Sequence, residues 1–137
     1  MASRATTLVD TNVLSDVLNS DPRWADWSAD RLAEAFDDGP VVINPIIYAE
    51  LAPSFTTVEL LDSAVPADRL TREPLPYQAG FLAGHVHLRY RRAGGTKRSP
   101  LPDFYIGAHA AVRGYRLLTR DVARYRTYFP RLDMVVP

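Results

Sequence analysis

Short apolar segments alternate along the chain with longer stretches in which apolar residues recur three and four positions apart. The uninterrupted apolar segments predict short strands that are covered on both faces. These strands are expected at 7–9, 41–43, 116–119 and 134–136, with a short edge strand at 69–71. The stretches with helical spacing predict helices at 11–18, 22–38, 46–51, 56–65, 75–92, 101–115 and 122–128.

Strands that alternate with helices predict an α/β fold with a central parallel sheet of four to five strands and helices on both faces. Two of the helix starts combine an N-cap residue with a proline, at Asp21–Pro22 and at Asn44–Pro45. The chain has 137 residues, of which 47% are hydrophobic, so a single domain over 1–137 can bury a full core.

Composition narrows the possible chemistry. The chain has no cysteine, which excludes disulfides and thiolate catalysis and makes a structural zinc site improbable. The first seven residues lack the apolar core of a signal peptide, and no apolar run approaches the length of a membrane span. We therefore expect a soluble cytoplasmic protein.

Four acidic residues occupy related places in the predicted fold. Asp10 directly follows the predicted strand 7–9, and Asp121 follows the predicted strand 116–119 after one intervening residue. Glu50 and Asp103 lie on the predicted helices 46–51 and 101–115. Side chains at the carboxyl ends of parallel strands share one crevice, where such folds bind ligands. We expect Glu50 on a buried face and Gly107 on the face that lets its helix approach the sheet. Each acid also has a structural explanation as a helix cap or a solvated side chain.

The coincidence of four acids in one crevice points to a cation. Carboxylates brought together repel one another, and a divalent ion would neutralise them. Because only oxygen ligands are offered, the ion expected is Mg²⁺ or Mn²⁺. The two histidines His85 and His87 stand two residues apart on different helix faces, which argues against a shared metal.

A basic segment precedes the helix that carries Asp103. Acidic and basic residues balance at sixteen each, so the overall charge does not favour a polyanion partner. The segment 89–100, however, contains five cations and no acid, namely Arg89, Arg91, Arg92, Lys97 and Arg98. It could bind a phosphate backbone, or it could be an ordinary solvated loop.

Four sequence blocks together resemble the PIN-domain nucleases, and within them the VapC-type toxins of bacterial toxin–antitoxin pairs. The blocks are Val9–Leu14, Asn44–Leu51, Pro102–Ala108 and Leu117–Asp121. The resemblance implies a PIN-like fold in which Asp10, Glu50 and Asp103 form the acidic core of a metal site. By the same resemblance Asp121 is the fourth acid, with Asn12 and Thr119 as polar supports. Relatives vary in where the last acid falls, and Arg124 occupies one later position that is acidic in some of them, so Asp121 could instead be only a cap.

The resemblance also implies an activity. It is that of an endoribonuclease, dependent on Mg²⁺ or Mn²⁺, that hydrolyses phosphodiester bonds in single-stranded or loop RNA and leaves 5′-phosphate and 3′-hydroxyl ends. A cognate antitoxin would inhibit it, and the protein would be a homodimer. The basic segment would guide RNA toward the acids.

Other functions stay open at this stage. A housekeeping RNA-processing nuclease of the same superfamily would have the same acids but no antitoxin. A catalytically inactive RNA-binding domain would keep the fold and lack metal binding. A phosphorylation-dependent receiver domain fits poorly, because the sole lysine, Lys97, lies in a loop before Asp103 and not near the last strands.

Overall fold

The computed structural model describes residues 5–137, and its centre is a parallel sheet of five strands in the order β3-β2-β1-β4-β5. The strands are β1 (Thr7–Val9), β2 (Val41–Ile43), β3 (Thr71–Arg72), β4 (Arg116–Leu118) and β5 (Met134–Val135). Each neighbouring pair is parallel, with Leu8 opposite Val42 on one side and Leu117 on the other. The expected α/β fold with a central parallel sheet is confirmed.

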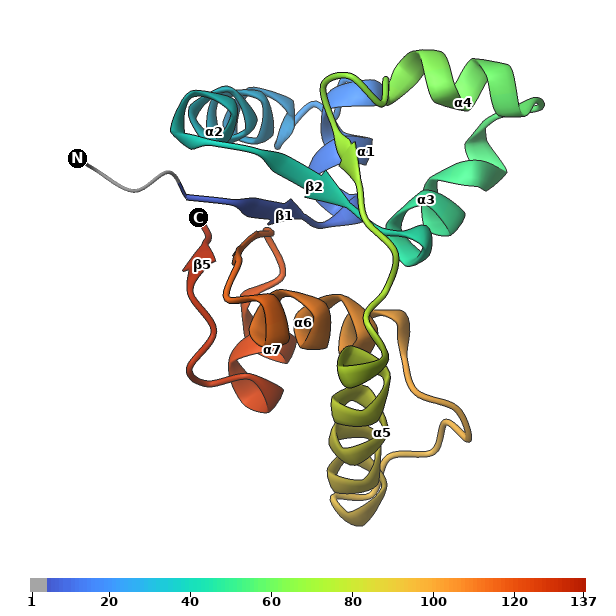
Figure 1. Ribbon diagram of the computed structural model, residues 1–137, viewed down its shortest axis with the longest axis vertical. Helices are drawn as coiled ribbons and strands as arrows, with labels where there is room; N and C mark the ends of the chain where they lie inside the picture. The colour runs from blue at the N-terminus through green and yellow to red at the C-terminus, as the bar shows by residue number, and fades with distance from the viewer. Residues whose placement is uncertain (1–4) are drawn as a thin grey trace.

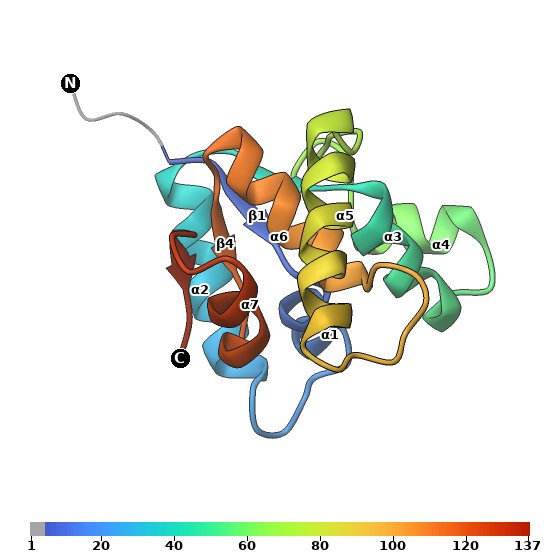
Figure 2. The ribbon, with the colours of Figure 1, turned by 90° about the horizontal axis from the view of Figure 1, so that it is seen from below.

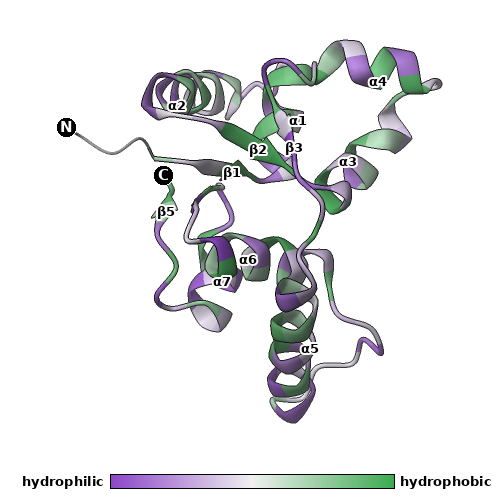
Figure 3. Ribbon diagram, in the orientation of Figure 1, coloured by the Kyte–Doolittle hydropathy of each residue, from purple (hydrophilic) through white to green (hydrophobic). Residues whose placement is uncertain are grey.

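Helices cover both faces of the sheet. The helices are α1 (Thr11–Leu18), α2 (Ala25–Asp38), α3 (Pro45–Leu51), α4 (Val58–Ala64), α5 (Tyr77–Arg92), α6 (Pro102–Arg113) and α7 (Val122–Tyr128), with a 3₁₀ turn η1 at Ala52–Ser54. Helices α1 and α2 lie on one face and α6 and α7 on the other, with α5 packed beside α6 (Figures 1 and 2). The central strands are therefore buried on both sides, which explains their uninterrupted apolar residues. In contrast, hydrophobic and hydrophilic residues alternate along α5 (Figure 3).

The local start signals work largely as predicted. The Asn44 side chain accepts a hydrogen bond from the backbone N–H of Ile47 and so caps α3. Asp21 accepts from the N–H groups of Arg23 and Trp24, but these residues form a turn, and α2 begins only at Ala25. The predicted helix start at Pro22 was thus three residues early, because Asp21 caps the turn and not the helix itself.

Two further expectations need correction. The edge strand lies at Thr71–Arg72 and not at 69–71, because the N–H groups of Arg69 and Leu70 bond back to the Pro66 carbonyl in a turn. The closest approach at Gly107 is to Phe129 and not to a strand of the sheet. A Cβ atom at Gly107 would lie 2.4 Å from the ring of Phe129, so this glycine makes room for the residue that follows α7.

The order of the strands reverses direction at β1, the central strand of the sheet. From β1 the chain crosses to β2, and β4 later returns to the other side of β1. In open parallel sheets, the carboxyl ends of the two strands at such a switch point form the crevice in which ligands bind. Here those ends carry Asp10 and the segment 119–121.

Among residues 5–137, no helix is both long enough and apolar enough to cross a membrane. Residues 1–4 lie outside the described part of the chain. The first residues of the expected domain 1–137, and of the segment predicted to lack a signal peptide, are therefore not described.

Candidate active site

Asp10 is the most enclosed of the four acids, with only 4% of the residue exposed. Its Oδ1 atom accepts a hydrogen bond from the N–H of Thr11 at 2.8 Å, which makes Asp10 the N-cap of α1 as expected. Its Oδ2 atom accepts from the hydroxyls of Thr119 at 2.8 Å and Tyr125 at 3.1 Å, and from the Asn12 amide at 3.3 Å. Elements from both ends of the chain therefore hold this carboxylate in one orientation.

The surroundings of Asp10 favour its protonated form. The pKa of Asp10 is raised from 3.8 to about 6, chiefly by burial and also by the negative charge of Asp103, although the hydrogen bonds from Thr119, Thr11 and Tyr125 oppose the rise. Burial and the charge of Asp10 also raise the pKa of the Tyr125 hydroxyl well above its usual value, so Tyr125 remains a donor at neutral pH. A bound cation would relieve the cost of the buried negative charge.

This raised pKa predicts that the chain, without divalent ions, is more stable in mild acid than at neutral pH. Folded Asp10 holds its proton more tightly than unfolded Asp10, so its contribution to stability is complete below pH 3.8 and is lost as the pH rises through about 6. The total loss is about 3 kcal/mol, of which about 1.4 kcal/mol falls between roughly pH 5 and pH 7.5. Urea unfolding of the wild type and of Asp10→Asn in EDTA measures it. An identical pH dependence in both proteins would contradict the assignment.

Glu50 differs from its expected position. The sequence predicts a glutamate on a buried face, but Glu50 is exposed while its helical neighbour Ile47 is fully buried. Helix α3 packs against α1. The Thr11 hydroxyl, at the start of α1, donates to Glu50 Oε1 at 2.7 Å. Partial desolvation by the surrounding protein raises the pKa of Glu50, and the charge of Asp103 raises it as well, whereas the hydrogen bond from Thr11 lowers it.

Asp103 lies in the first turn of α6, where it is electrostatically coupled to all three other acids. Partial burial raises the pKa of Asp103, the positive charge of Arg124 lowers it, and the charge of Asp121 raises it. Its own charge in turn raises the pKa values of Asp10 and Glu50. The charge of Asp103 thus acts on Asp10 and Glu50, and Thr11 joins these two acids directly, because its N–H donates to Asp10 and its hydroxyl donates to Glu50.

Asp121 does not cap α7 through its side chain, which makes no capping hydrogen bond. Its backbone N–H donates to Thr119 Oγ1 at 3.1 Å, and the same oxygen accepts from the Asn12 amide at 3.3 Å. Thr119 thus links the backbone of Asp121 to the carboxylate of Asp10. The Asp121 carboxylate is exposed and does not cap the helix.

A buried ion pair next to this cluster was missed from the sequence. Asp16 on α1, 2% exposed, accepts two hydrogen bonds from the Arg120 guanidinium, at 2.8 and 2.9 Å, and one from Ser28. The backbone N–H of Arg120 also donates to the side chain of Asn12. This pair ties the loop that carries Thr119 and Asp121 to α1. Nothing in the local pattern singles out Asp16, because its partner lies more than a hundred positions away in sequence.

Tyr125 and Thr11 were also missed, although both carried a local signal. Tyr125 stands four residues after Asp121, which places the two near one face at the start of α7, and Thr11 directly follows Asp10.

The donor set suits a hard divalent cation. Within residues 5–137 no three acidic, histidine or cysteine side chains form a compact group that could hold a metal ion as they stand. The four acids nevertheless offer only oxygen atoms, the ligands preferred by Mg²⁺ and Mn²⁺, and burial of Asp10 penalises its charge in a way that a cation would offset. Asp10, Glu50, Asp103 and Asp121 therefore fit such an ion chemically.

The basic segment consists of the last turn of α5, which carries Arg89, Arg91 and Arg92, and of the loop that follows it, and its cations differ in what they contact. Arg89 donates to the Tyr128 carbonyl, and Arg91 donates to the carbonyls of Thr96 and Lys97. The Tyr90 hydroxyl accepts from the backbone N–H groups of Thr96 and Lys97, which folds the loop over its ring. Within the described chain, Arg92, Lys97 and Arg98 have no such intramolecular bond and are exposed.

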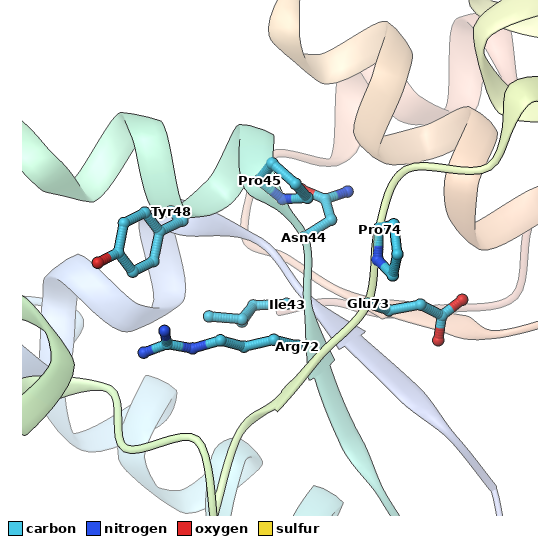
Figure 4. A pocket seen from close by; sticks show the side chains of 7 residues that line it. All are labelled: Ile43, Asn44, Pro45, Tyr48, Arg72, Glu73 and Pro74. Atoms are coloured by element: carbon cyan, nitrogen blue, oxygen red, sulfur yellow. The ribbon is translucent and has the colours of Figure 1, made fainter.

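A hollow of about 410 Å³ lies near the carboxyl ends of β2 and β3 (Figure 4). Its lining consists of Ile43, Asn44, Pro45, Tyr48, Arg72, Glu73 and Pro74. None of the four acids lines it. Glu73 is engaged in a network with the buried His109 and with Tyr115, and His109 also bonds the Asn44 amide. This network joins the cap of α3 to α6, which supports a structural role for His109.

The comparisons with known proteins agree with this architecture. The family model described as PIN domain matches residues 7–130. Ribonuclease VapC10 from Mycobacterium tuberculosis is 30% identical over 130 residues, which cover 95% of this chain and 90% of the relative.

Solved structures show the same fold at lower identity. A chain of VapBC2 from Rickettsia felis, bound to a promoter DNA fragment, has a TM-score of 0.74 at 19% identity, with 96% of this chain and 98% of that chain covered. A chain of VapBC-1 from nontypeable Haemophilus influenzae has a TM-score of 0.71 at 19% identity, with 96% and 97% covered.

Proposed function

The chain belongs to the PIN-domain family and is a distant homologue of a VapC ribonuclease, and from these premises we propose that it is an endoribonuclease dependent on Mg²⁺ or Mn²⁺. Its substrate is single-stranded or loop RNA, and its role is that of the toxin in a toxin–antitoxin pair. The observation that carries the proposal is the buried carboxylate of Asp10 at the end of β1, which Thr119 and Tyr125 hold by hydrogen bonds. Thr11 links it to Glu50, since the Thr11 N–H donates to Asp10 and the Thr11 hydroxyl donates to Glu50.

In this proposal Asp10, Glu50, Asp103 and Asp121 hold the metal. A bound divalent ion lowers the pKa of its water ligand and stabilises negative charge on the reacting phosphate. The residues of the chain fix the geometry. Thr119, Tyr125 and Asn12 orient Asp10 through Oδ2, and Thr11 orients Glu50. The buried Asp16–Arg120 pair holds the loop from which Thr119 and Asp121 come.

The experiment that tests this activity uses the purified chain and total cellular RNA. We expect fragments with Mg²⁺ or Mn²⁺ and none with EDTA. Intact RNA under every metal condition, together with no binding of Mn²⁺ by calorimetry, would favour an inactive RNA-binding domain instead.

The basic loop binds the RNA backbone in this proposal. Lys97 and Arg98 are the strongest candidates, because their side chains are exposed and uncommitted, and the loop runs from α5 to the start of α6, where Asp103 lies. The guanidinium of Arg91 instead holds the loop through the Thr96 and Lys97 carbonyls, and that of Arg89 binds the Tyr128 carbonyl at the end of α7. Their contribution to RNA binding is therefore expected to be indirect.

Removal of both loop cations is expected to weaken RNA binding. In EDTA, which prevents cleavage, Lys97→Ala/Arg98→Ala should bind a single-stranded RNA about tenfold more weakly than wild type near 0.1 M salt. The slope of log affinity against log salt should fall by about 1.4, since each lost phosphate contact removes about 0.7 for single strands. Fluorescence anisotropy measures both.

The matched control is Arg31→Ala. It removes a cation from α2, which lies on the face of the sheet opposite to α5, α6 and the loop that joins them. It should leave affinity and slope near the wild-type values. An unchanged salt slope in the double variant would remove the loop from the RNA-binding surface.

A protein partner is the last component of the proposal. One solved structure with this fold is a toxin–antitoxin complex from Klebsiella pneumoniae. We infer a cognate antitoxin here and a homodimer of the chain, acting in the cytoplasm. Tyr77 and Phe81, 97% and 72% exposed, stand four residues apart on α5, and such exposed apolar side chains support a protein-binding face. Growth arrest on expression of the chain, relieved by the neighbouring small gene, would identify a toxin. Normal growth of a strain in which the expressed chain cleaves RNA would instead identify a housekeeping nuclease.

A further inference from the structure

One positive side chain stands directly against the acidic cluster. Arg124 lies in the first turn of α7, and its Nη1 atom is 3.6 Å from Oδ2 of Asp103. Among the ion pairs within residues 5–137, this is the only one that involves any of the four acids. The chain thus places a cation of its own beside carboxylates that could otherwise hold a metal ion.

The position of Arg124 lets its guanidinium compete with a bound cation for two of the acids, Asp103 and Asp121. Asp121 precedes Arg124 by three residues, so both lie on one face at the start of α7. Arg124 also contacts Asp103 at 3.6 Å, while Asp121 occupies the N-cap position of the same helix. A cation held between Asp103 and Asp121 would therefore meet the guanidinium of Arg124 at close range.

The contact between Arg124 and Asp103 is loose enough to be exchanged. Charge-assisted hydrogen bonds to carboxylates are typically about 2.7 to 2.9 Å long, and 3.6 Å is well beyond that range. The Arg124 side chain is 44% exposed, and a pair of this kind adds little to stability. A planar guanidinium binds phosphate oxygens in the same forked geometry in which it binds a carboxylate. Arg124 can thus leave Asp103 for a substrate phosphate without leaving the site.

We propose that Arg124 takes the place of a second metal ion, so that the site binds one divalent cation and the guanidinium provides the other positive charge to the reacting phosphate. This inference rests on the proposed function and goes beyond it, because many nucleases bind two ions at such sites.

The number of bound ions tests the inference. Electron paramagnetic resonance of free Mn²⁺ during a titration counts the ions bound per chain. We expect one for the wild type and two for Arg124→Glu, which removes the competing charge and adds a carboxylate. The matched control is Arg126→Glu, which makes the same charge change two residues further along α7, where no ion pair is formed, and it should bind one.

The possible results separate the inference from the function on which it rests. Two Mn²⁺ ions in the wild type, with RNA cleavage retained, would overturn the inference and leave the nuclease standing. A single ion in a folded Arg124→Glu protein would also overturn it. Should circular dichroism show that this variant does not fold, Arg124→Gln replaces it, and the same gain of a second, weaker ion is expected. No bound ion and no cleavage in the wild type would overturn both.

Discussion

Replacement of Asp10 by asparagine is expected to lower the rate of RNA cleavage by about a thousandfold or more, which corresponds to about 4 kcal/mol of lost transition-state stabilisation. Asparagine keeps the size of the side chain and an oxygen that can accept from Thr119 and Tyr125, but it loses the charge that would hold a metal ion. Because the pKa of Asp10 is raised to about 6, the variant should also be more stable than the wild type at pH 7.5 in EDTA. Single-turnover cleavage rates and urea unfolding measure the two effects.

The control for Asp10→Asn is Asp30→Asn on α2, which makes the same change in charge at an exposed position. Its cleavage rate and stability should match those of the wild type. Full cleavage by Asp10→Asn would show that Asp10 is only a helix cap.

Replacement of Arg120 by alanine is expected to have the largest effect on stability, about 3 kcal/mol. Removal of one partner of a buried ion pair leaves the other charge uncompensated, and here it leaves Asp16, 2% exposed, with Ser28 as its remaining side-chain donor. For a chain of this length the midpoint of thermal unfolding should fall by about 10 °C. Thermal unfolding followed by circular dichroism measures this change.

The chain provides a close control for Arg120→Ala. Arg31 and Arg120 both have side chains that are 32% exposed, but Arg31 pairs with the exposed Glu34. Arg31→Ala should therefore cost about 0.5 kcal/mol or less. Equal losses in the two variants would mean that burial of Asp16 does not determine the strength of its pair.

The fold was largely readable from the sequence because its signals are local. Uninterrupted apolar segments gave β1 and β2, and the Asn44 cap gave the start of α3. The start of α2 was misplaced because Asp21 and Pro22 carry the signal of a helix start while forming a separate turn. The position of β3 was shifted because its hydrogen-bonding partner, β2, lies about thirty residues earlier in the chain.

The site was readable only in part, because its supporting contacts are long-range. The four acids could be singled out by their positions after strands and on adjacent helices. The Asp16–Arg120 pair and the Tyr125 bond to Asp10 join residues more than a hundred positions apart, and no periodicity marks such pairs. The exposure of Glu50 depends on how α3 packs against α1, which its own helical face does not reveal.

The ends of the RNA fragments test the central claim most directly. Total RNA is incubated with Mg²⁺ and either the wild type or Asp103→Ala, and the new ends are sequenced. The account predicts 5′-phosphate and 3′-hydroxyl ends with the wild type and no new ends with Asp103→Ala. New ends of the same kind and number with Asp103→Ala would contradict a hydrolytic site built on these acids.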